Sequence, residues 1–495
     1  MPRSRATART AENADRLLAE AIAHHRAGRP DQAAVLYRHL LAVAPASGDG
    51  LHLLGLTAYQ AGRLEKAISL FGRALAITPL AALYHGNLGL AQRKQKMVQP
   101  AEASFRRAIE LRPDYPEALN NLGLLLQEEN CPRAAASYVR AMALRPDYAE
   151  AFNNLGTLAQ DLGRLEQAES LYRRALAVDP GFADAHNNLG MTLLLGGHLA
   201  EGWTEYAWRW QAETMRGLRR NFSVPAWAGE DLGGRTILLH AEQGLGDTIQ
   251  FCRYAPLVAE RGARVLLEVD PPLVALLSSL PGIDAVIAKG LTLPSFDFHC
   301  PLVSLPRIFG TDLSSIPASV PYLAAEDKRV RLWRRRIGSA GLRVGINWQG
   351  DPRSMAERGR SPPLVTWTPL AAQTGVRLIS LQKHNGLEQL EHLPAGMAVE
   401  TLAPDFDAGP DGFLDTAAVM ATLDLIVTSD TAIAHLAGAL GRPVWVALKA
   451  VPHWIWLMDR EDSPWYPTMR LFRQQTAGDW STVFQAMALA LKDWP

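Results

Sequence analysis

The chain has 495 residues, more than one hydrophobic core usually organises, so we expect two to four domains. Hydrophobic residues make up 48% and charged residues 20% of the sequence, which is ordinary for a folded protein and excludes a disordered or collagen-like chain. Fifty Lys and Arg balance fifty Asp and Glu, so no net charge attracts nucleic acid or an anionic membrane surface. Nucleic acid is therefore not an expected partner.

The three cysteines, Cys131, Cys252 and Cys300, lie far apart and form no C-x-x-C pair. This spacing predicts neither a disulfide framework nor a zinc site, and it fits a reducing cytoplasm. No apolar segment follows the basic N-terminal stretch, and no stretch reaches about 18 apolar residues. We therefore expect a cytoplasmic protein with no signal peptide and no membrane span.

The first part of the chain repeats with a period of 33 or 34 residues. Five units have an alanine followed four residues later by an aromatic residue in the second helix, then a proline that ends the unit, and from the second unit onwards a glycine recurs in the first helix. The glycines are Gly55, Gly89, Gly123, Gly156 and Gly190; the alanines are Ala33, Ala67, Ala101, Ala134 and Ala168. The aromatic residues are Tyr37, Phe71, Phe105, Tyr138 and Tyr172. The four-residue offset places a small and a large side chain on one helical face, which allows two helices to interlock.

This pattern resembles the tetratricopeptide repeat, with five units and a degraded sixth over residues 13–212. We expect residues 1–12 to form a disordered tail and 213–234 to form a linker. Gly28, Gly62, Gly163 and Gly197 mark the turn within a unit, and Lys96 and Asn130 replace glycine there in two units. Such helix pairs stack into a superhelix whose inner face is a long groove, so this part is expected to bind and not to catalyse.

A row of asparagines follows the first helices of the repeats. Asn87, Asn121, Asn154 and Asn188 each stand two residues before the repeat glycine. Amide side chains both donate and accept hydrogen bonds, so this row could hold the backbone of an extended polypeptide acceptor. A similar ladder is known in the O-linked N-acetylglucosamine transferases, which also carry these repeats. The alternative is that asparagine is simply common at this position of the repeat.

The second half of the chain changes to short apolar runs that alternate with helical stretches. This alternation occurs twice and predicts two parallel sheets covered by helices, over residues 235–337 and 338–495. Ligands bind at the carboxyl ends of strands in such folds, so we expect the two sheets to face a common cleft. The fold class is thus an all-α superhelix followed by an α/β part with two Rossmann-like domains.

Four runs in this half carry a family resemblance: HAEQGLGDTIQFCRYAPLVAERGA, GINWQGDPRSMAERGRSPPL, SLQK and SDTAIAHLAGALGRPVW. In content and order they are similar to glycosyltransferase family 9, the heptosyltransferase-like enzymes of the GT-B fold. The whole chain resembles bacterial proteins that fuse tetratricopeptide repeats to such a domain. The resemblance implies an acceptor side at residues 235–337, a donor side at 338–495 and a metal-independent, inverting transfer from a nucleotide sugar.

The first run places a glycine-rich turn between a strand and a helix. Gly246, Asp247 and Thr248 open this helix, where backbone amides can approach a ligand. The resemblance implies that Asp247 is the general base that removes the proton from the acceptor hydroxyl. The alternative is that Asp247 only caps the helix. Gln250 and Arg253, one turn further on, are weaker candidates to face the acceptor or a phosphate.

The last run places Asp430, Thr431 and His435 directly after the strand LIVTS. A helix that begins at Thr431 presents free amides and a hydroxyl to the phosphate of a nucleotide donor, whose charge grows as the glycosidic bond breaks. We expect Asp430 to lie near the sugar and His435 one turn inside the helix. The alternatives are a capping role for Asp430 and a packed, structural His435.

Further residues at strand ends complete the predicted donor site. These are Trp348, Arg360, Ser361, Gln382 and Lys383. Arg360 and Lys383 would supply positive charge to the leaving phosphate, and Trp348 could stack on the base or sugar, although a tryptophan at a strand end is more often part of the core. Asp405 and Asp407 form a D-x-D triplet, but such matches are common by chance, so we assign no metal site and no cofactor.

Three functions remain open from the sequence. The first is transfer of a sugar from a nucleotide sugar to a protein held by the repeats, such as flagellin or another secreted subunit. The second is transfer to a glycan or lipopolysaccharide, with the repeats serving assembly. The third is a non-enzymatic scaffold with an inactive transferase domain.

Overall fold

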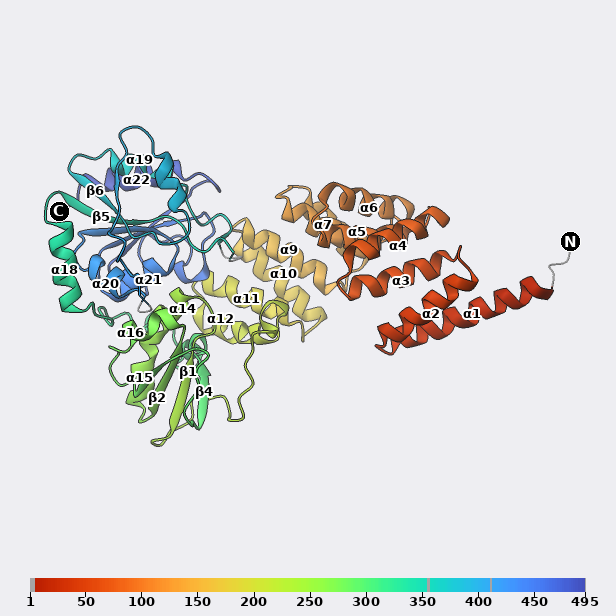
Figure 1. Ribbon diagram of the computed structural model, residues 1–495, viewed down its shortest axis with the longest axis horizontal. Coiled ribbons are helices and arrows are strands. Elements are labelled where there is room, and N and C mark those ends of the chain that lie inside the picture. The colour runs from red at the N-terminus through yellow and green to blue at the C-terminus, as the bar shows by residue number, and fades with distance from the viewer. Residues whose placement is uncertain (1–4, 354–356, 410–411, 495) are drawn as a thin grey trace. The chain divides into compact units, whose positions relative to one another are not determined.

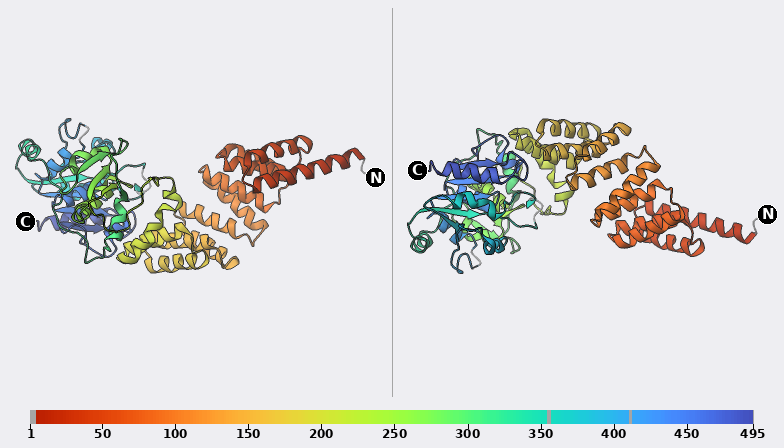
Figure 2. Two further views of the ribbon diagram at one scale, coloured as in Figure 1. Left: turned by 90° about the horizontal axis from the view of Figure 1, so that it is seen from below. Right: turned by 90° about the horizontal axis from the view of Figure 1, so that it is seen from above.

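The computed structural model describes residues 5–353, 357–409 and 412–494 (Figure 1). Contacts between residues divide the chain into two compact units. The first unit comprises Met1–Ala159 and Ser170–Phe182, and the second comprises Gln160–Glu169 and Ala183–Pro495. The last repeat helices therefore share a unit with the sheets that follow them, and Figure 2 shows both kinds of architecture from two further directions.

The repeat region consists of helix pairs, which confirms the predicted tetratricopeptide superhelix. Its helices are α1 (Arg5–Arg26), α2 (Pro30–Val43), α3 (Gly48–Gln60), α4 (Leu64–Ile77), α5 (Ala82–Lys94), α6 (Val98–Leu111), α7 (Pro116–Glu128), α8 (Ala134–Leu144), α9 (Ala149–Asp161), α10 (Leu165–Val178), α11 (Ala183–Leu195) and α12 (Leu199–Tyr206). Helix α1 begins at Arg5, so residues 5–12 are helical and not the disordered tail expected from the sequence. Alanines in this stretch favour a helix and outweigh its polar composition.

The repeat glycines make room for the aromatic residues of the second helices. A Cβ atom on Gly55 would lie 2.7 Å from Cε1 of Phe71, and Gly89 has the same relation to Phe105. The aromatic partners Phe71, Phe105, Tyr138 and Tyr172 are fully buried. The alanines that precede these residues by four positions, Ala67, Ala101, Ala134 and Ala168, are buried as well, which confirms the predicted face of small and large residues; the fit of the glycines to the aromatic rings was not predicted.

The turns inside the repeats use left-handed backbone. Gly28 and Gly62 have φ of +71° and +72°. Lys96 and Asn130 stand at the same point of their units and adopt φ of +60° and +53°. The turn geometry is thus kept without glycine, at a cost that is larger for lysine than for asparagine.

The second unit contains two parallel sheets. The first sheet has the strand order β3-β2-β1-β4, formed by β1 (Thr236–His240), β2 (Arg264–Val269), β3 (Ala285–Ala288) and β4 (Phe298–Pro301). Its strands are connected by α14 (Leu245–Phe251), α15 (Ala255–Glu260) and α16 (Val274–Leu277), and α17 (Leu305–Ile308) follows the last of them. Because the order reverses between β1 and β4, the carboxyl ends of these two strands form a topological switch point.

The second sheet has the order β10-β9-β8-β5-β6-β7 and is also parallel. Its strands are β5 (Leu342–Asn347), β6 (Val376–Ser380), β7 (Val399–Glu400), β8 (Leu425–Ser429), β9 (Val444–Leu448) and β10 (Met469–Arg473). Its main helices are α19 (Thr368–Ala371), α20 (Leu414–Met420), α21 (Ala432–Ala439) and the closing helix α22 (Ser481–Leu491). The order reverses between β5 and β8. The two sheets confirm the predicted α/β class and are consistent with a GT-B-like fold.

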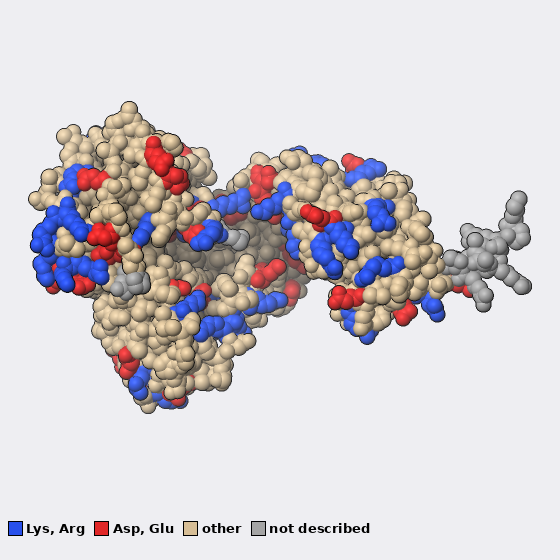
Figure 3. All heavy atoms as spheres, in the orientation of Figure 1, with Lys and Arg blue, Asp and Glu red and all other residues tan. Residues whose placement is uncertain are grey.

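Helix α18 (Asp327–Ile337) lies between the two sheets in the sequence and is strongly basic. Its last turn carries Arg334, Arg335 and Arg336, and Figure 3 shows Lys and Arg gathered where this helix lies. Two ion pairs fasten it to the second sheet's domain, from Arg329 to Asp415 at 2.9 Å and from Arg336 to Asp405 at 2.8 Å. Among the helices that the structure describes, none is long and apolar enough to cross a membrane.

Candidate active site

Helix α14 follows strand β1 and carries the predicted base at its start. The carboxylate of Asp247 accepts a hydrogen bond through Oδ2 from the backbone N–H of Gly244 at 3.0 Å, so it does cap the helix. This bond leaves Oδ1 outside the cap, and the side chain is partly exposed. Thr248 is only 2% exposed, and its hydroxyl donates to the carbonyl oxygen of Gly244 at 3.2 Å. Thr248 therefore belongs to the helix interior and not to the predicted donor contacts.

Gly246 brings the starts of two helices from different sheets together. A Cβ atom on Gly246 would lie 2.8 Å from Cδ2 of His435 and 3.5 Å from Cα of Ala432, both in α21. Only a residue without a side chain allows this approach. The start of α14, which carries Asp247, therefore lies against the start of α21, which follows Asp430.

Asp430 and Thr431 follow strand β8, at the switch point of the second sheet. Asp430 is 8% exposed. The Thr431 hydroxyl accepts a hydrogen bond from the N–H of Ile433 at 3.3 Å and donates to Oδ1 of Asn347 at 2.8 Å. Thr431 is thus the cap of α21 and ties this loop to the end of strand β5. Its hydroxyl is committed to these bonds, so a contact with the donor phosphate would come from backbone amides.

His435 is a buried, neutral histidine. Its Nδ1 lies 3.1 Å from the Tyr466 hydroxyl, and its ring stacks on Trp456 with centroids 5.2 Å apart. Burial lowers the pKa of His435 to about 3, so the ring carries no charge near neutral pH. The structure favours the packed role over direct donor binding, and His435 positions the loop of Gly246.

We call Asp247, Asp430, His453 and Arg360 the junction cluster, because their charges act on one another where the two sheets' loops meet. Burial raises the pKa of Asp247, and the negative charge of Asp430 raises it further, while His453 opposes this shift. Burial lowers the pKa of His453, against the pull of both carboxylates and together with the charge of Arg360. A carboxyl group whose pKa is raised towards neutrality is suited to take a proton.

His453 is the member of this cluster that sequence reasoning missed. It lies after strand β9, in the stretch VPHW, which belongs to none of the four runs that carry the family resemblance. The one available signal was its place beyond the carboxyl end of a strand, where functional residues of such folds gather.

Arg360 and Ser361 lie close to the end of strand β5. Arg360 donates from Nε to Glu357 Oε2 at 3.0 Å, and Ser361 hydrogen-bonds to the same carboxylate. The Ser361 hydroxyl also accepts from the N–H of Gly350 at 3.2 Å. Glu357 therefore holds both side chains against the loop after β5, and it offsets part of the positive charge of Arg360.

Gln382 and Trp348 have structural roles, which corrects their predicted donor contacts. The amide oxygen of Gln382 accepts from the backbone N–H groups of Trp348 and Gln349, both at 3.0 Å. Its amide nitrogen donates to the carbonyl oxygens of Gln349 and Asn385, both at 2.8 Å. Trp348 is fully buried, and its indole N–H donates to Gly386 at 3.1 Å. Neither side chain has a group left to face a nucleotide.

Lys383 and the D-x-D triplet are also occupied by contacts within the protein. The Lys383 ammonium donates to the carbonyl oxygen of Phe406 at 2.8 Å and to that of Asp407. The Asp405 carboxylate pairs with Arg336, and that of Asp407 accepts from the N–H of Asp415 at 2.8 Å. Lys383 thus orders the loop that holds the triplet, and the two carboxylates do not converge.

Arg253 and Gln250 are buried and do not face a ligand. The Arg253 guanidinium donates to the carbonyl oxygen of Trp465 at 2.7 Å and to the Tyr322 hydroxyl at 3.0 Å. It therefore joins the helical layer of the first sheet to the second sheet's domain. Gln250 is fully buried. This position corrects the weaker expectation that both residues contact the acceptor or a phosphate.

The asparagine row makes contacts between neighbouring repeats. Asn87 Nδ2 lies 2.7 Å from His52 Nε2, and Asn154 Nδ2 donates to Asn120 Oδ1 at 3.0 Å. Asn121 is partly exposed on α7. In the second unit, Asn188 accepts from the Thr192 hydroxyl through its backbone carbonyl at 2.9 Å. At least two of the predicted acceptor-binding amides therefore also stabilise the stack of repeats.

Family comparisons agree with this architecture. Models of the tetratricopeptide repeat match residues 18–82, 52–116, 149–182 and 171–204. The model described as glycosyltransferase family 9 (heptosyltransferase) matches residues 368–448. The chain contains tetratricopeptide repeats and a glycosyltransferase family 9 domain. The matched part of that domain includes Asp430 and His435, whereas Asp247 and Arg360 lie outside it.

Individual relatives cover parts of the chain. Protein FlbA of Caulobacter vibrioides is 27% identical over 330 residues, which represent 61% of this chain and 54% of FlbA, so the match spans about half of that relative. The solved repeat protein TTC0263 of Thermus thermophilus is 24% identical, with a TM-score of 0.33. The match covers 37% of this chain and 99% of the TTC0263 chain. A structure of PilF from Pseudomonas aeruginosa is 21% identical, with a TM-score of 0.36, and covers 42% of this chain and 94% of its own.

Proposed function

We propose that the protein is a glycosyltransferase that moves a sugar from a nucleotide sugar to a hydroxyl group of a polypeptide held by the repeats. One observation carries this proposal: Gly246 and His435 bring the start of α14, which carries Asp247, against the start of α21, which follows Asp430, and the charges of Asp430 and His453 act on Asp247. A base from one domain and a donor-side loop from the other are what transfer between two substrates requires. The family 9 match supports the transferase class.

In the proposed reaction, the acceptor oxygen attacks the anomeric carbon while its proton passes to Asp247. The bond between the anomeric carbon and the nucleotide phosphate breaks, and its electron pair stays on the phosphate oxygen. The backbone amides at the start of α21 and the guanidinium of Arg360 would stabilise that charge. Attack from the face opposite the leaving group inverts the anomeric centre. The charged groups named here need no metal ion, so we propose a metal-independent reaction.

The repeats support a polypeptide acceptor, because stacked helix pairs of this kind present an extended groove. We propose an acceptor met in the cytoplasm, and flagellin or another secreted subunit is the kind to test first. A glycan acceptor would instead leave the repeats without a role in substrate binding.

A thermal-shift screen tests this proposal. The full chain is heated with nucleoside monophosphate and diphosphate sugars, since a ligand that binds only the folded state raises the melting temperature. The donor found in this way is then incubated with the protein in excess chelator, and nucleotide release is followed. We expect a shift with one nucleotide class and slow hydrolysis without metal. A scaffold without activity would release no nucleotide, and rescue by manganese would contradict the metal-independent reaction.

A further inference from the structure

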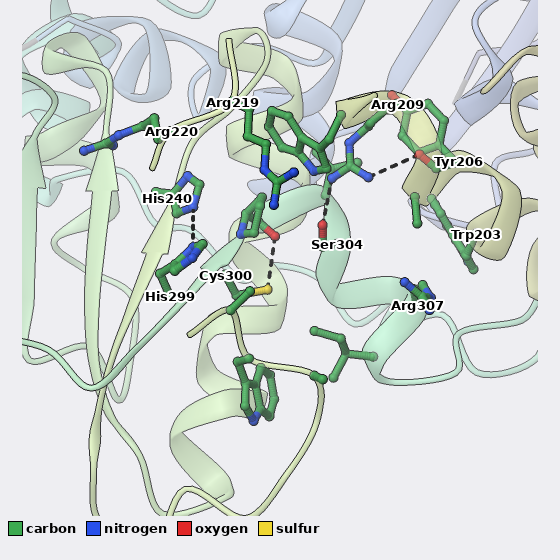
Figure 4. Close-up of a pocket in the computed structure, with 18 residues that line it drawn as sticks. Trp203, Tyr206, Arg209, Arg219, Arg220, His240, His299, Cys300, Ser304 and Arg307 are labelled. Carbon is green, nitrogen blue, oxygen red and sulfur yellow. Dashed lines mark hydrogen bonds between the residues drawn. The ribbon is translucent and has the colours of Figure 1, made fainter. Parts of the chain in front are cut away.

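A cavity of about 490 Å³ lies at the switch point of the first sheet, and no member of the junction cluster is among its lining residues (Figure 4). His240, the last residue of β1, and His299, within β4, both line it. Trp210, from the end of the last repeat, and Trp227, from the segment before β1, also line it. In an open α/β sheet, ligands bind at this place. The volume of the cavity and its aromatic walls suit a small chemical group.

The cavity has an excess of positive charge. Arg209 and Arg220 both line it, but each is paired with a buried acid: Arg209 with Glu242 at 2.9 Å, and Arg220 with Glu268. The remaining two arginines are Arg219 and Arg307. Both are exposed, and neither forms an ion pair with any residue that the structure describes. Two uncompensated guanidinium groups therefore face a single cavity.

The histidine pair adds an unsatisfied polar atom. Nε2 of His240 lies 3.4 Å from Nδ1 of His299, as Figure 4 shows. His240 is 3% exposed, and its Nδ1 has no hydrogen-bond partner among the described residues. Burial lowers the pKa of His240 to about 3 and also lowers that of His299, to which the charges of Arg219 and Arg220 contribute. Both histidines are thus neutral, so the positive charge of the cavity comes from its arginines alone.

We propose that this cavity binds the carboxylate of an Asp or Glu side chain of the acceptor polypeptide, an inference that rests on the proposed function. Arg219 and Arg307 supply the planar donors that match a carboxylate. The cavity walls come from the last repeat, the segment that follows it and the first sheet, and all of these belong to the second unit.

One hydrogen bond connects the lining of the cavity to the turn before α14, the helix that carries Asp247. Tyr206 lines the cavity, and its hydroxyl accepts a hydrogen bond from Gln243 Nε2 at 2.8 Å. Gln243 precedes Asp247 by four residues. A chain of n residues spans at most about 3.3 to 3.6 Å per residue. The acidic residue and the acceptor hydroxyl should accordingly lie close together in the sequence of the polypeptide.

The test uses the full chain and two synthetic peptides that share one Ser and flexible Gly spacers. One peptide carries two Asp residues near the Ser, and its counterpart carries two Asn residues. Binding is measured by the fluorescence of the protein's tryptophans at low salt, with inorganic phosphate as a third probe. We expect the Asp peptide to bind at least about tenfold more tightly than the Asn peptide. The double variant Arg219→Gln/Arg307→Gln should remove this advantage.

The control variant is Arg334→Gln/Arg335→Gln on α18, which removes the same charge elsewhere and should keep the preference for Asp. Equal binding of both peptides, or an unchanged preference in the cavity variant, would overturn the inference. Phosphate that binds more tightly than the Asp peptide and displaces it would show a phosphate site instead. The donor thermal shift is measured in parallel: its absence would count against the proposed function, whereas loss of the Asp preference alone counts against the cavity.

Discussion

His435 occupies the space that a side chain on Gly246 would need, with its Cδ2 2.8 Å from the position of the missing Cβ. The histidine cannot easily move, because Tyr466 and Trp456 hold its ring. This contact joins the loop of the proposed base to the donor-side helix, so the geometry of the junction cluster depends on it.

Gly246→Ala is expected to separate these two loops. A displacement of the base by a fraction of an ångström should lower kcat by about 10²-fold while the protein stays folded. Steady-state kinetics and circular dichroism measure the two effects. Gly72→Ala is the control, because a Cβ on Gly72 meets nothing within 4 Å, and it should keep full activity. Normal kcat in Gly246→Ala would show that the contact does not position the base.

The pH profile should depend on Asp430. Activity requires ionised Asp247, so it falls as the pH drops through the pKa of this residue, which burial and Asp430 raise. Asp430→Asn removes the like charge, and the acidic limb of kcat/KM should move to lower pH whatever the change in maximal rate. Asp405→Asn, on a carboxylate paired with Arg336, should leave the limb in place. A limb that stays fixed or moves to higher pH in Asp430→Asn would contradict this coupling.

His435 should make stability depend on pH. Burial lowers its pKa to about 3 in the folded state, against about 6.5 in the unfolded chain. The unfolded state therefore binds an extra proton in this window, and the free energy of unfolding decreases as pH falls through it. In His435→Gln, the slope should decrease by up to about 1.4 kcal/mol per pH unit. Urea unfolding between about pH 7 and 5 measures the slope, and the exposed His392→Gln should match the wild type.

Replacing Lys96 with glycine is expected to stabilise the first unit. It holds φ of +60° at a repeat turn where other units have glycine. Lys96→Gly should raise the free energy of unfolding by about 0.5 to 1 kcal/mol, because the left-handed strain outweighs the added entropy of the unfolded chain. The exposed helical residue Lys66 is the control, since Lys66→Gly should destabilise by about 1 kcal/mol. An equal decrease in the free energy of unfolding in both variants would show that the backbone at Lys96 is not strained.

Much of the fold could be predicted from the spacing of residue types along the sequence. The period of 33 or 34 residues predicted the helix pairs, and the alanines four residues before the aromatic residues predicted their packed face. The alternation of apolar runs with helices likewise predicted two parallel sheets. Helix α1 was missed at its start, because a polar composition obscured the helix propensity of its alanines.

The site was predictable only in part, since motifs place residues at strand ends but do not show which groups are already bonded. The starts of the two predicted helices do meet, at Gly246 and His435, and the charge of Asp430 acts on Asp247. Gln382 lies at the right strand end, yet both ends of its amide are used by backbone groups that only the folded loop brings near. His453 joins the cluster from a segment without a recognisable motif.

The central claim is that Asp247 is the general base, and Asp247→Asn tests it most directly. The amide keeps the shape of the side chain and can still accept the hydrogen bond from the N–H of Gly244, but it cannot take a proton. The measurement is the rate of nucleotide release, with and without acceptor, together with the thermal shift produced by the same donor. The account predicts an unchanged shift and a rate lower by about 10²- to 10⁴-fold. A rate close to that of the wild type would contradict it and leave Asp247 with its capping role alone.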